Sequence, residues 1–431
     1  MSDVFYRSPS AHYPLIAGGA GIYLWDAEGR RYLDGSSGAL VANLGHGRRE
    51  IVDAMAQQAG SVAFAHTQRF TSAAQEALGH HVARLLPGDL SHTYPVSGGS
   101  EATETAIKLA RQYFLEGGQS ERYRVVTQWP SYHGNTLGAL AASGHLARRR
   151  PYDPLLSAAA FVHAPQPRSD CRGRAAGGWC PCVAEVGATI ERAGPETVAA
   201  ILWEPISGSA ASGFVPHPGF FTQLRKLCDR WGILLIVDEV MAGLGRTGRM
   251  LGVEHHAVDP DIVTLAKGLS GGYAPLGAVV ATDRVYNAIA QGSGRFVHGF
   301  TFGGHPVACA AGAKALEILE AEDLVRRSAL MGVQLARGLH ALRARHPVVR
   351  EVRGRGLMQG LVLETDRRVP GGRASQLGQR AFDRGLLIYP GSGEGASPYG
   401  DHVLIGPPLV ITAEEVATLL MMLDDSLAAL T

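Results

Sequence analysis

The chain has 431 residues, of which 46% are hydrophobic and 18% are charged, and its formal net charge is +1. This composition is typical of a globular protein with two or three domains. A near-neutral charge gives no reason to expect binding to nucleic acid or to an anionic membrane surface. The N-terminus lacks the pattern of a signal peptide, and no apolar run approaches the ~20 residues of a membrane helix. We therefore expect a cytoplasmic protein with no membrane partner.

The first 90 residues combine short strands with two helices. Residues 21–34 predict a hairpin, because two short apolar segments flank a glycine-containing turn at residues 27–29. Apolar residues spaced four apart favour a helix over residues 49–59. A second helix fits residues 72–86, where a Pro-Gly pair ends the pattern.

In the middle of the chain, strands alternate with helices. Most of these strands are apolar throughout, which indicates a mostly parallel sheet covered by helices on both faces. The predicted strands are residues 124–127, 198–203, 233–237, 262–265 and 277–281. Glu204, Asp238 and Lys267 follow three of them. Open α/β sheets bind ligands at the carboxyl edge of their strands, so we expect these three side chains at one site.

The pattern changes towards the C-terminus. Two long helices over residues 306–320 and 324–345 precede four short strands, and Thr412 to Glu415 match the capping box of a final helix. The four strands are expected at residues 348–353, 357–363, 386–389 and 402–405. We predict an α/β fold with a large domain over residues 71–325. A smaller α+β domain combines residues 1–70 with residues 326–431.

Lys267 has an unusual setting for a lysine. The chain contains four lysines against 36 arginines, and the other three lysines lie in helical patterns that fit solvated positions. Lys267 lies instead in a glycine-rich apolar stretch, where an unpaired charge is costly. Because an arginine guanidinium stays protonated, a lysine here indicates that the chemistry needs an amine that can lose its proton.

A glycine-rich segment precedes a strongly predicted helix. Ser97-Gly98-Gly99-Ser100 follows a short strand and opens the helix that runs to about residue 114. The free N–H groups and the positive end of a helix can hold a phosphate. A plain capping loop is the alternative, since serine is a preferred N-cap residue.

The order of the motifs gives the strongest signal, and it covers the chain from about Gly21 to Thr412. The motifs are Ser97-Gly98-Gly99-Ser100-Glu101-Ala102, Tyr132-His133-Gly134, Glu204-Pro205, Val237-Asp238-Glu239-Val240, Lys267 and Phe300-Thr301-Phe302-Gly303-Gly304-His305-Pro306. Their order, and the 29-residue step from Asp238 to Lys267, closely resemble the class III aminotransferases. These enzymes depend on pyridoxal 5'-phosphate and have fold type I.

The resemblance implies a catalytic pair. Lys267 is expected to hold the cofactor as an imine and then to act as acid and base in the proton shift. Asp238 is expected to pair with the ring nitrogen of the cofactor and keep it protonated. An amine or amino acid would then pass its amino group to a 2-oxo acid by a ping-pong mechanism.

The resemblance also implies cofactor contacts and a dimer. Gly99 and Ser100 are expected to bind the phosphate, Tyr132 to stack on the ring, and Val240 to lie on the opposite face. In the family, the residue that matches Thr301 reaches the phosphate from the partner subunit, which implies a homodimer with shared active sites. For Val240 and Thr301, simple packing is the alternative.

Two departures from the family leave the substrates open. Members that accept α-ketoglutarate often carry an arginine at the position of Asn135. Many members that use pyruvate carry an arginine near the position of Ser397. Neither arginine is present here, although an arginine pairs specifically with a carboxylate. Leu40, Phe64 and Phe70 are candidates for an apolar substrate pocket, and core packing is the alternative.

Other functional classes remain as alternatives. Residues 243–248 match the G-x-G-x-x-G pattern of nicotinamide oxidoreductases, but Asp238-Glu239 intervenes and no convincing helix follows. A catalytically silent binding protein would not need the intact Lys267 and Asp238. An aminomutase, a racemase or a decarboxylase of the same fold uses the same two residues.

The chain contains five cysteines, an odd number that argues against a disulfide framework. Cys171, Cys180 and Cys182 lie in one loop rich in glycine and arginine, and His163 is the nearest histidine before them. Their spacing fits no strong zinc pattern, so free thiols are expected and no metal is predicted.

Overall fold

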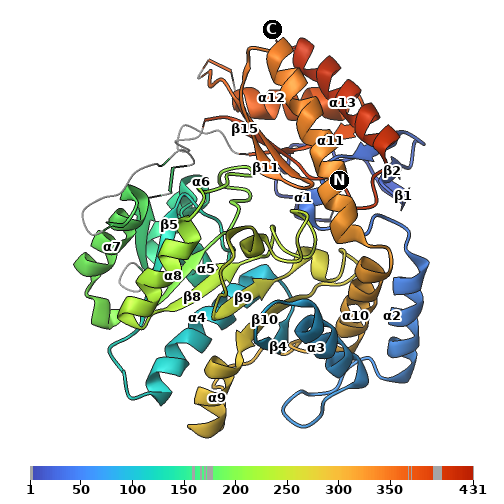
Figure 1. Cartoon of the computed structure of the whole chain (residues 1–431). Coiled ribbons are helices and arrows are strands. Elements are labelled where there is room, and N and C mark those ends of the chain that lie inside the picture. Colours follow the sequence, from blue (N-terminus) through green and yellow to red (C-terminus); the bar gives the residue numbers. More distant parts are fainter. Residues whose placement is uncertain are drawn as a thin grey trace.

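The computed structural model describes residues 3–157, 161–165, 167–168, 171, 178–366, 368–369, 371–391 and 400–430. A large α/β part is built on a seven-stranded sheet, and a smaller part combines strands and helices from both ends of the chain (Figure 1). The boundaries at residues 70 and 325 stay a prediction.

The seven-stranded sheet has the order β4-β10-β9-β8-β7-β5-β6. Its strands are β4 (Leu90–Val96), β5 (Arg124–Trp129), β6 (Phe161–Pro165), β7 (Val198–Trp203), β8 (Leu234–Asp238), β9 (Ile262–Leu265) and β10 (Gly277–Thr282). Only β10 runs antiparallel to its neighbours, β4 and β9. The predicted mostly parallel sheet is therefore confirmed.

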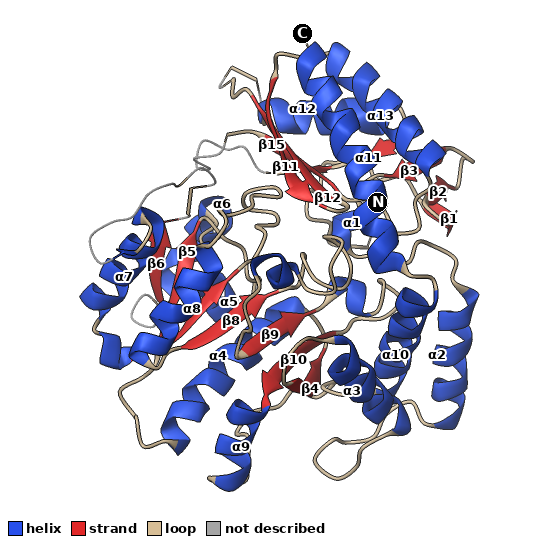
Figure 2. Ribbon diagram, viewed as in Figure 1, coloured by secondary structure: helices blue, strands red, loops and turns tan. Residues whose placement is uncertain are grey.

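Helices cover both faces of this sheet (Figure 2). Neighbouring residues of β8 alternate between two hydrophobic clusters: Leu235 and Val237 belong to one, Leu234 and Ile236 to the other. The second cluster includes apolar residues of α4 and α9, while the first includes residues of α3, α7, α8 and α10. These helices are α3 (Ala73–Leu85), α4 (Gly99–Glu116), α7 (Pro181–Ala193), α8 (Phe220–Trp231), α9 (Asp283–Gln291) and α10 (Pro306–Ala321). Burial on both faces explains why the strands are apolar throughout.

Two four-stranded sheets form the smaller part. One has the order β1-β2-β3-β13 and joins strands from both ends of the chain, and the other has the order β11-β12-β15-β14. Their strands are β1 (Ile16–Ala20), β2 (Tyr23–Asp26), β3 (Arg31–Asp34), β11 (Val349–Arg355), β12 (Met358–Leu363), β13 (Leu386–Leu387), β14 (Tyr389–Pro390) and β15 (His402–Ile405). The expectation of one strand over residues 386–389 was wrong. β13 pairs in parallel with β3, whereas β14 pairs antiparallel with β15.

The helices near the C-terminus follow the predicted pattern closely. α11 packs against α13, whose capping box at Thr412 and Glu415 is present as predicted. α2 lies along α10, beside the large sheet rather than among the C-terminal helices (Figure 1). These helices are α2 (Arg49–Ser61), α11 (Leu324–Arg345), α12 (Gly372–Asp383) and α13 (Ala413–Ala428), and shorter helical segments are α1 (Ser37–Leu40), α5 (Leu137–Ala142) and α6 (Leu146–Arg149).

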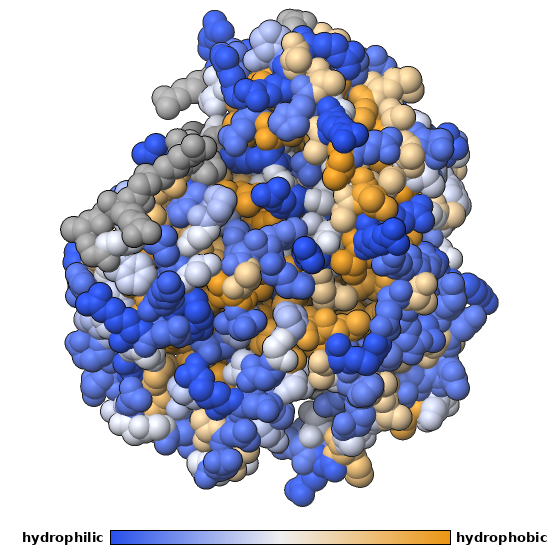
Figure 3. Space-filling view, in the orientation of Figure 1, coloured by the Kyte–Doolittle hydropathy of each residue, from blue (hydrophilic) through white to orange (hydrophobic). Residues whose placement is uncertain are grey.

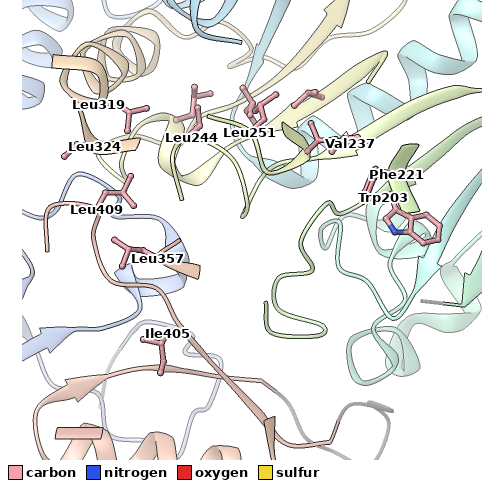
Figure 4. Close-up of a cluster of buried hydrophobic side chains, with 14 of the residues drawn as sticks. Trp203, Phe221, Val237, Leu244, Leu251, Leu319, Leu324, Leu357, Ile405 and Leu409 are labelled. Carbon is pink, nitrogen blue, oxygen red and sulfur yellow. The ribbon is translucent and has the colours of Figure 1, made fainter. Parts of the chain in front are cut away.

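One hydrophobic cluster continues from the large sheet into the smaller part. Figure 4 shows it running from Trp203 and Val237 through Leu244 to Leu357 and Ile405. On the face seen in Figure 3, polar side chains cover most of the surface and apolar side chains gather in the middle. Among the helices within the described ranges, none is both long and apolar enough to cross a membrane.

The connection between β8 and β9 carries a buried arginine that joins three parts of the chain. The Arg246 guanidinium donates to the carbonyl oxygen of Pro407, to that of Leu357 at 3.2 Å, to Oδ1 of Asn43 and to Oγ of Ser37 at 3.2 Å. The connection includes the G-x-G-x-x-G match, yet a 3-10 turn over Gly252–His256 follows it instead of an α-helix. The G-x-G-x-x-G match therefore lacks the helix that a nicotinamide-binding site requires.

Candidate active site

A cavity of about 320 Å³ lies at the carboxyl edge of the large sheet. It collects residues from the loops that follow β4, β5, β7, β8 and β9. Six of the seven predicted site residues line it: Gly99, Ser100, Tyr132, Asp238, Val240 and Lys267. We call this space the Lys267 cavity. Parallel strands point their carboxyl ends the same way, so this is where residues distant in sequence are expected to meet.

Lys267 follows β9 and is half-buried. Its φ angle of 48° lies in the left-handed region, which side-chain-bearing residues adopt at a cost of about 1–3 kcal/mol. Burial lowers the pKa of Lys267, while the charges of Asp238 and Glu204 act in the opposite direction. A lowered pKa increases the share of neutral amine, which is the nucleophilic form.

Asp238 ends β8 and is held by three donors. Its Oδ2 lies 2.7 Å from Nδ1 of His133, and its Oδ1 accepts from the backbone N–H of Val240 at 3.0 Å and from Oγ1 of Thr264 at 3.2 Å. The short contact with a carboxylate places a proton on Nδ1 of His133. These bonds hold the Asp238 carboxylate in place in the lining of the cavity.

The start of α4 forms an anion cradle. Its N-cap, Gly98, makes no side-chain capping bond, and no acceptor within the described part of the chain takes the backbone N–H of Gly99 or Ser100. A Cβ at Gly99 would lie 3.0 Å from Cγ1 of Val240, and one at Gly134 would lie 2.6 Å from Oγ of Ser100. Glycines therefore keep open a space that a phosphate can fill, as the positive end of a helix favours.

Two buried residues with no predicted role contact the predicted site residues. His133 is one, and it belongs to the Tyr132-His133-Gly134 motif. Glu204 is the other; it accepts the backbone N–H of Gly208 at 2.9 Å and that of Tyr132 at 3.3 Å, and burial raises its pKa. The signal for His133 is its position beside Tyr132 in one motif. Glu204 was expected at this edge because it follows an apolar strand, and it lines the cavity.

Thr301 lies apart from the Lys267 cavity. It is exposed in the loop before α10 and lines a second hollow of about 820 Å³, together with His66, Tyr94 and His298. Within one chain the structure therefore does not bring Thr301 to Lys267.

The residues suggested for substrate specificity are scattered. Leu40 is buried against Met358 and Leu404 in a separate hydrophobic cluster, and Phe64 and Phe70 are exposed. None of the three lines the Lys267 cavity, whereas Val41 and Met241 do. Asn135 donates its backbone N–H to Oγ of Ser100 at 3.0 Å. Ser397 lies outside the described residues.

These groups fit pyridoxal phosphate. The cavity presents an amine for the aldehyde, a carboxylate for the ring nitrogen and a helix N-terminus for the phosphate. Its volume lies at the small end of the range for cofactor pockets. Fold and site together define a pyridoxal-phosphate-dependent enzyme of fold type I.

Comparison with known proteins gives the family. The sequence model described as "Aminotransferase class-III" matches residues 6–427. The chain is 37% identical to the uncharacterized aminotransferase YodT of Bacillus subtilis, over 97% of this chain and 96% of that protein. It is 34% identical to a diaminobutyrate–2-oxoglutarate transaminase of Halomonas elongata, over 93% of this chain and 87% of that protein.

A solved structure agrees with this assignment. The amine transaminase of an uncultivated Pseudomonas species, in its pyridoxal-phosphate-bound form, matches with a TM-score of 0.89 and 33% identity, covering 100% of this chain and 99% of that one. The chain belongs to the class III aminotransferase family. It is a transaminase that depends on pyridoxal phosphate.

Substituting His133→Phe removes the donor to Oδ2 of Asp238. A hydrogen bond to a charged group contributes about 1.5–3 kcal/mol, so we expect turnover to fall about 10- to 100-fold. The pH dependence of the absorbance of the bound cofactor should also change, because Asp238 is less firmly held. Steady-state kinetics and absorption spectra across pH measure both effects.

His163→Phe is the matched control for this substitution. His163 is half-buried on the neighbouring β6, where it packs against Trp129 with ring centroids 4.9 Å apart. This variant should keep the turnover and the spectra of the unmodified chain. Equal losses in both variants would contradict a specific role for His133.

Proposed function

We propose that the chain transfers an amino group from a small amine or amino acid to a 2-oxo acid in two half-reactions, with Lys267 as the essential amine. The observation that carries this proposal is the burial of Lys267 beside the carboxylates of Asp238 and Glu204, with a lowered pKa. An amine in this setting can exchange with a substrate amine and then carry a proton.

Six residues of the Lys267 cavity have named tasks in this proposal. When bound, pyridoxal phosphate supplies an aldehyde that captures amines and a ring that accepts electrons. Asp238 holds a proton at the ring nitrogen, and the backbone N–H groups of Gly99 and Ser100 bind the phosphate. Tyr132 and Val240 enclose the two faces of the ring. Lys267 would take the proton from the substrate carbon that carries the nitrogen and deliver it to the carbon on the other side of that nitrogen.

Aminomutases, racemases and decarboxylases share these residues, so the reaction must be tested with substrates. A panel of amines and amino acids should convert the cofactor to its amine form. Pyruvate, α-ketoglutarate or glyoxylate should then restore it. Restoration by none of the three oxo acids would contradict the transfer of an amino group to a 2-oxo acid.

Substituting Lys267→Ala should abolish turnover, because no other amine lines the cavity among the described residues. Steady-state kinetics measures the loss. Lys108→Ala is the matched control, since Lys108 lies exposed on α4, and its turnover should be unchanged.

The small number of lysines allows a second, chemical measurement. After borohydride reduction of the chain with its cofactor, mass spectrometry should find the cofactor on Lys267 and not on Lys108, Lys226 or Lys314. Attachment at another lysine, or appreciable activity of Lys267→Ala, would remove Lys267 from its assigned role.

We also propose a homodimer in which Thr301 reaches the phosphate in the partner's cavity. Its exposure and its distance from the Lys267 cavity of its own chain support this arrangement. Large apolar side chains are exposed in the same loop: Val297 and Phe302 are 75% and 58% exposed, and the Phe302 ring centroid lies 6.1 Å from that of Phe64. An exposed apolar group of this kind is typical of a surface that another protein covers.

A mixing experiment tests the shared site. Thr301→Ala should weaken cofactor binding about 10- to 100-fold, as the loss of one charge-assisted hydrogen bond predicts. When this variant is mixed with Lys267→Ala and the subunits exchange, each heterodimer contains one site with both residues intact. Titration with the cofactor should then detect sites of full affinity. Their absence, or a monomer in analytical ultracentrifugation, would contradict the shared site.

Arg148 is our candidate for the substrate carboxylate. It lies on α6 with its guanidinium carbon 4.5 Å from the centroid of the Tyr132 ring, and its charge helps to lower the pKa of Lys267. Within the described ranges, no carboxylate pairs with it. It therefore offers a free guanidinium near the cavity, where the two arginines that many relatives use are replaced by Asn135 and Ser397.

Arg148→Leu should raise KM at least tenfold for donors and acceptors that carry a carboxylate, and leave KM for a simple arylalkylamine unchanged. Arg150→Leu, two residues along and exposed, is the matched control. The comparison of KM with kcat for the two donor classes decides the role. Equal changes for both classes would exclude Arg148 as the carboxylate-binding residue.

Location in the cytoplasm also remains part of the proposal. It is supported by the composition of the chain and by the lack of a disulfide bond among its five cysteines, all of which are described.

A further inference from the structure

Three cysteines and one histidine gather at the edge of the large sheet, away from the Lys267 cavity. A ligand atom from each of Cys171, Cys182 and His217 lies within 4.8 Å of the other two. The sulfur of Cys180 lies 3.1 Å from Nε2 of His217. Cys180 and Cys182 flank Pro181, the first residue of α7, while His217 lies just before α8. We call these four residues the Cys3His cluster.

The histidine is oriented as a metal ligand. Nδ1 of His217 lies 2.9 Å from the carbonyl oxygen of Pro218, which can only accept a hydrogen bond. The proton of the neutral ring is therefore on Nδ1, and the lone pair of Nε2 points towards the sulfur of Cys180. A hydrogen bond from the second ring nitrogen to a backbone carbonyl is the usual way in which a protein fixes a ligating imidazole.

The surrounding structure also holds the cysteine sulfurs of the cluster in place. The backbone N–H of Arg168 donates to the sulfur of Cys182 at 3.2 Å, and Cys180, Cys182 and His217 are each at least 94% buried. Burial raises the pKa of Cys180 and raises that of Cys182 to about 12, so without a cation these thiols keep their protons. A divalent cation reverses this preference, because it binds and stabilises thiolates.

We propose that Cys171, Cys180, Cys182 and His217 bind one Zn²⁺ ion in a closed tetrahedral site. Three thiolates and one imidazole form a common ligand set of structural zinc sites. With Zn–S bonds of about 2.3 Å, tetrahedral geometry separates the sulfurs by about 3.8 Å, which fits the 4.8 Å limit for the ligand atoms of Cys171, Cys182 and His217. Cys180 joins this set through the 3.1 Å distance from its sulfur to Nε2 of His217. Binding converts three thiols to thiolates and releases three protons.

The site joins three segments that the sheet does not hold together. It connects residue 171, beyond the edge strand β6, to the start of α7 and to the segment before α8. Because the four ligands leave no open coordination position, the ion stabilises structure rather than taking part in catalysis. The sequence pointed to His163 as the nearest histidine, but His217 completes the cluster, 35 residues beyond Cys182.

The metal content of the purified chain tests this proposal. After growth with zinc and exhaustive dialysis, mass spectrometry should find about one zinc per chain. Cys182→Ser should lose most of it. Cys228→Ser is the matched control, because Cys228 is equally buried on α8 but lies outside the cluster, and it should keep the zinc. Retention by Cys182→Ser, or absence from the unmodified chain, would overturn the proposal.

A second measurement does not depend on the folding of a variant. When a mercurial reagent titrates the unmodified chain, zinc should be released and detected with a metal-sensitive dye. Refilling with Co²⁺ should produce sulfur-to-cobalt charge-transfer bands and the visible bands of a tetrahedral site. Chelation should lower the melting temperature of the unmodified chain but not that of Cys182→Ser.

Counting thiols separates the metal site from a disulfide. In denaturant and chelator, without reductant, the chain should show all five thiols. A count of three, with no zinc bound, would mean that two of these cysteines form a disulfide and would overturn the proposal.

Discussion

The site depends on one electrostatic constraint: an amine is buried beside two carboxylates. Burial lowers the pKa of Lys267, while the charges of Asp238 and Glu204 oppose that shift. Because these two effects oppose each other, the amine can lose its proton while the Asp238 carboxylate stays nearby to pair with the cofactor ring. The backbone of Lys267 is strained, with φ at 48°, and such strain persists only where the surrounding structure holds it.

The surroundings that hold Lys267 extend beyond the large sheet. Arg246 lies in the same connection between β8 and β9 that begins with Asp238, and it binds acceptors from both ends of the chain. Burying a guanidinium is costly unless hydrogen bonds compensate, and the bonds from the two terminal nitrogens of Arg246 tie the smaller part to the loop next to the site. The continuous hydrophobic cluster in Figure 4 has the same effect. The position of the smaller part is thus linked to the geometry of the cavity.

Local patterns predicted most of the elements well. The helix expected over residues 324–345 is α11 with the same bounds. The helix expected over residues 72–86 is α3, which begins at Ala73 with the Ser72 side chain as its cap. These signals involve residues within a few positions of one another. The segment over residues 386–389 was harder, because its halves pair with Leu33 and with Leu404, and no local pattern contains that choice. β6 was not predicted either, although its pairing with β5 is regular.

The sequence by itself determined which chemical groups are available and which strands they follow. Asp238 and Lys267 follow apolar strands, and parallel strands bring such ends to one edge. Only the tertiary structure decided which side chains contact one another. It brought His133 to Asp238 across 105 positions, and His217 to the three cysteines. It also kept Thr301 away from the cavity of its own chain. The physical reason is that a single histidine or threonine carries no periodic signal, so its partner is fixed only when the core packs.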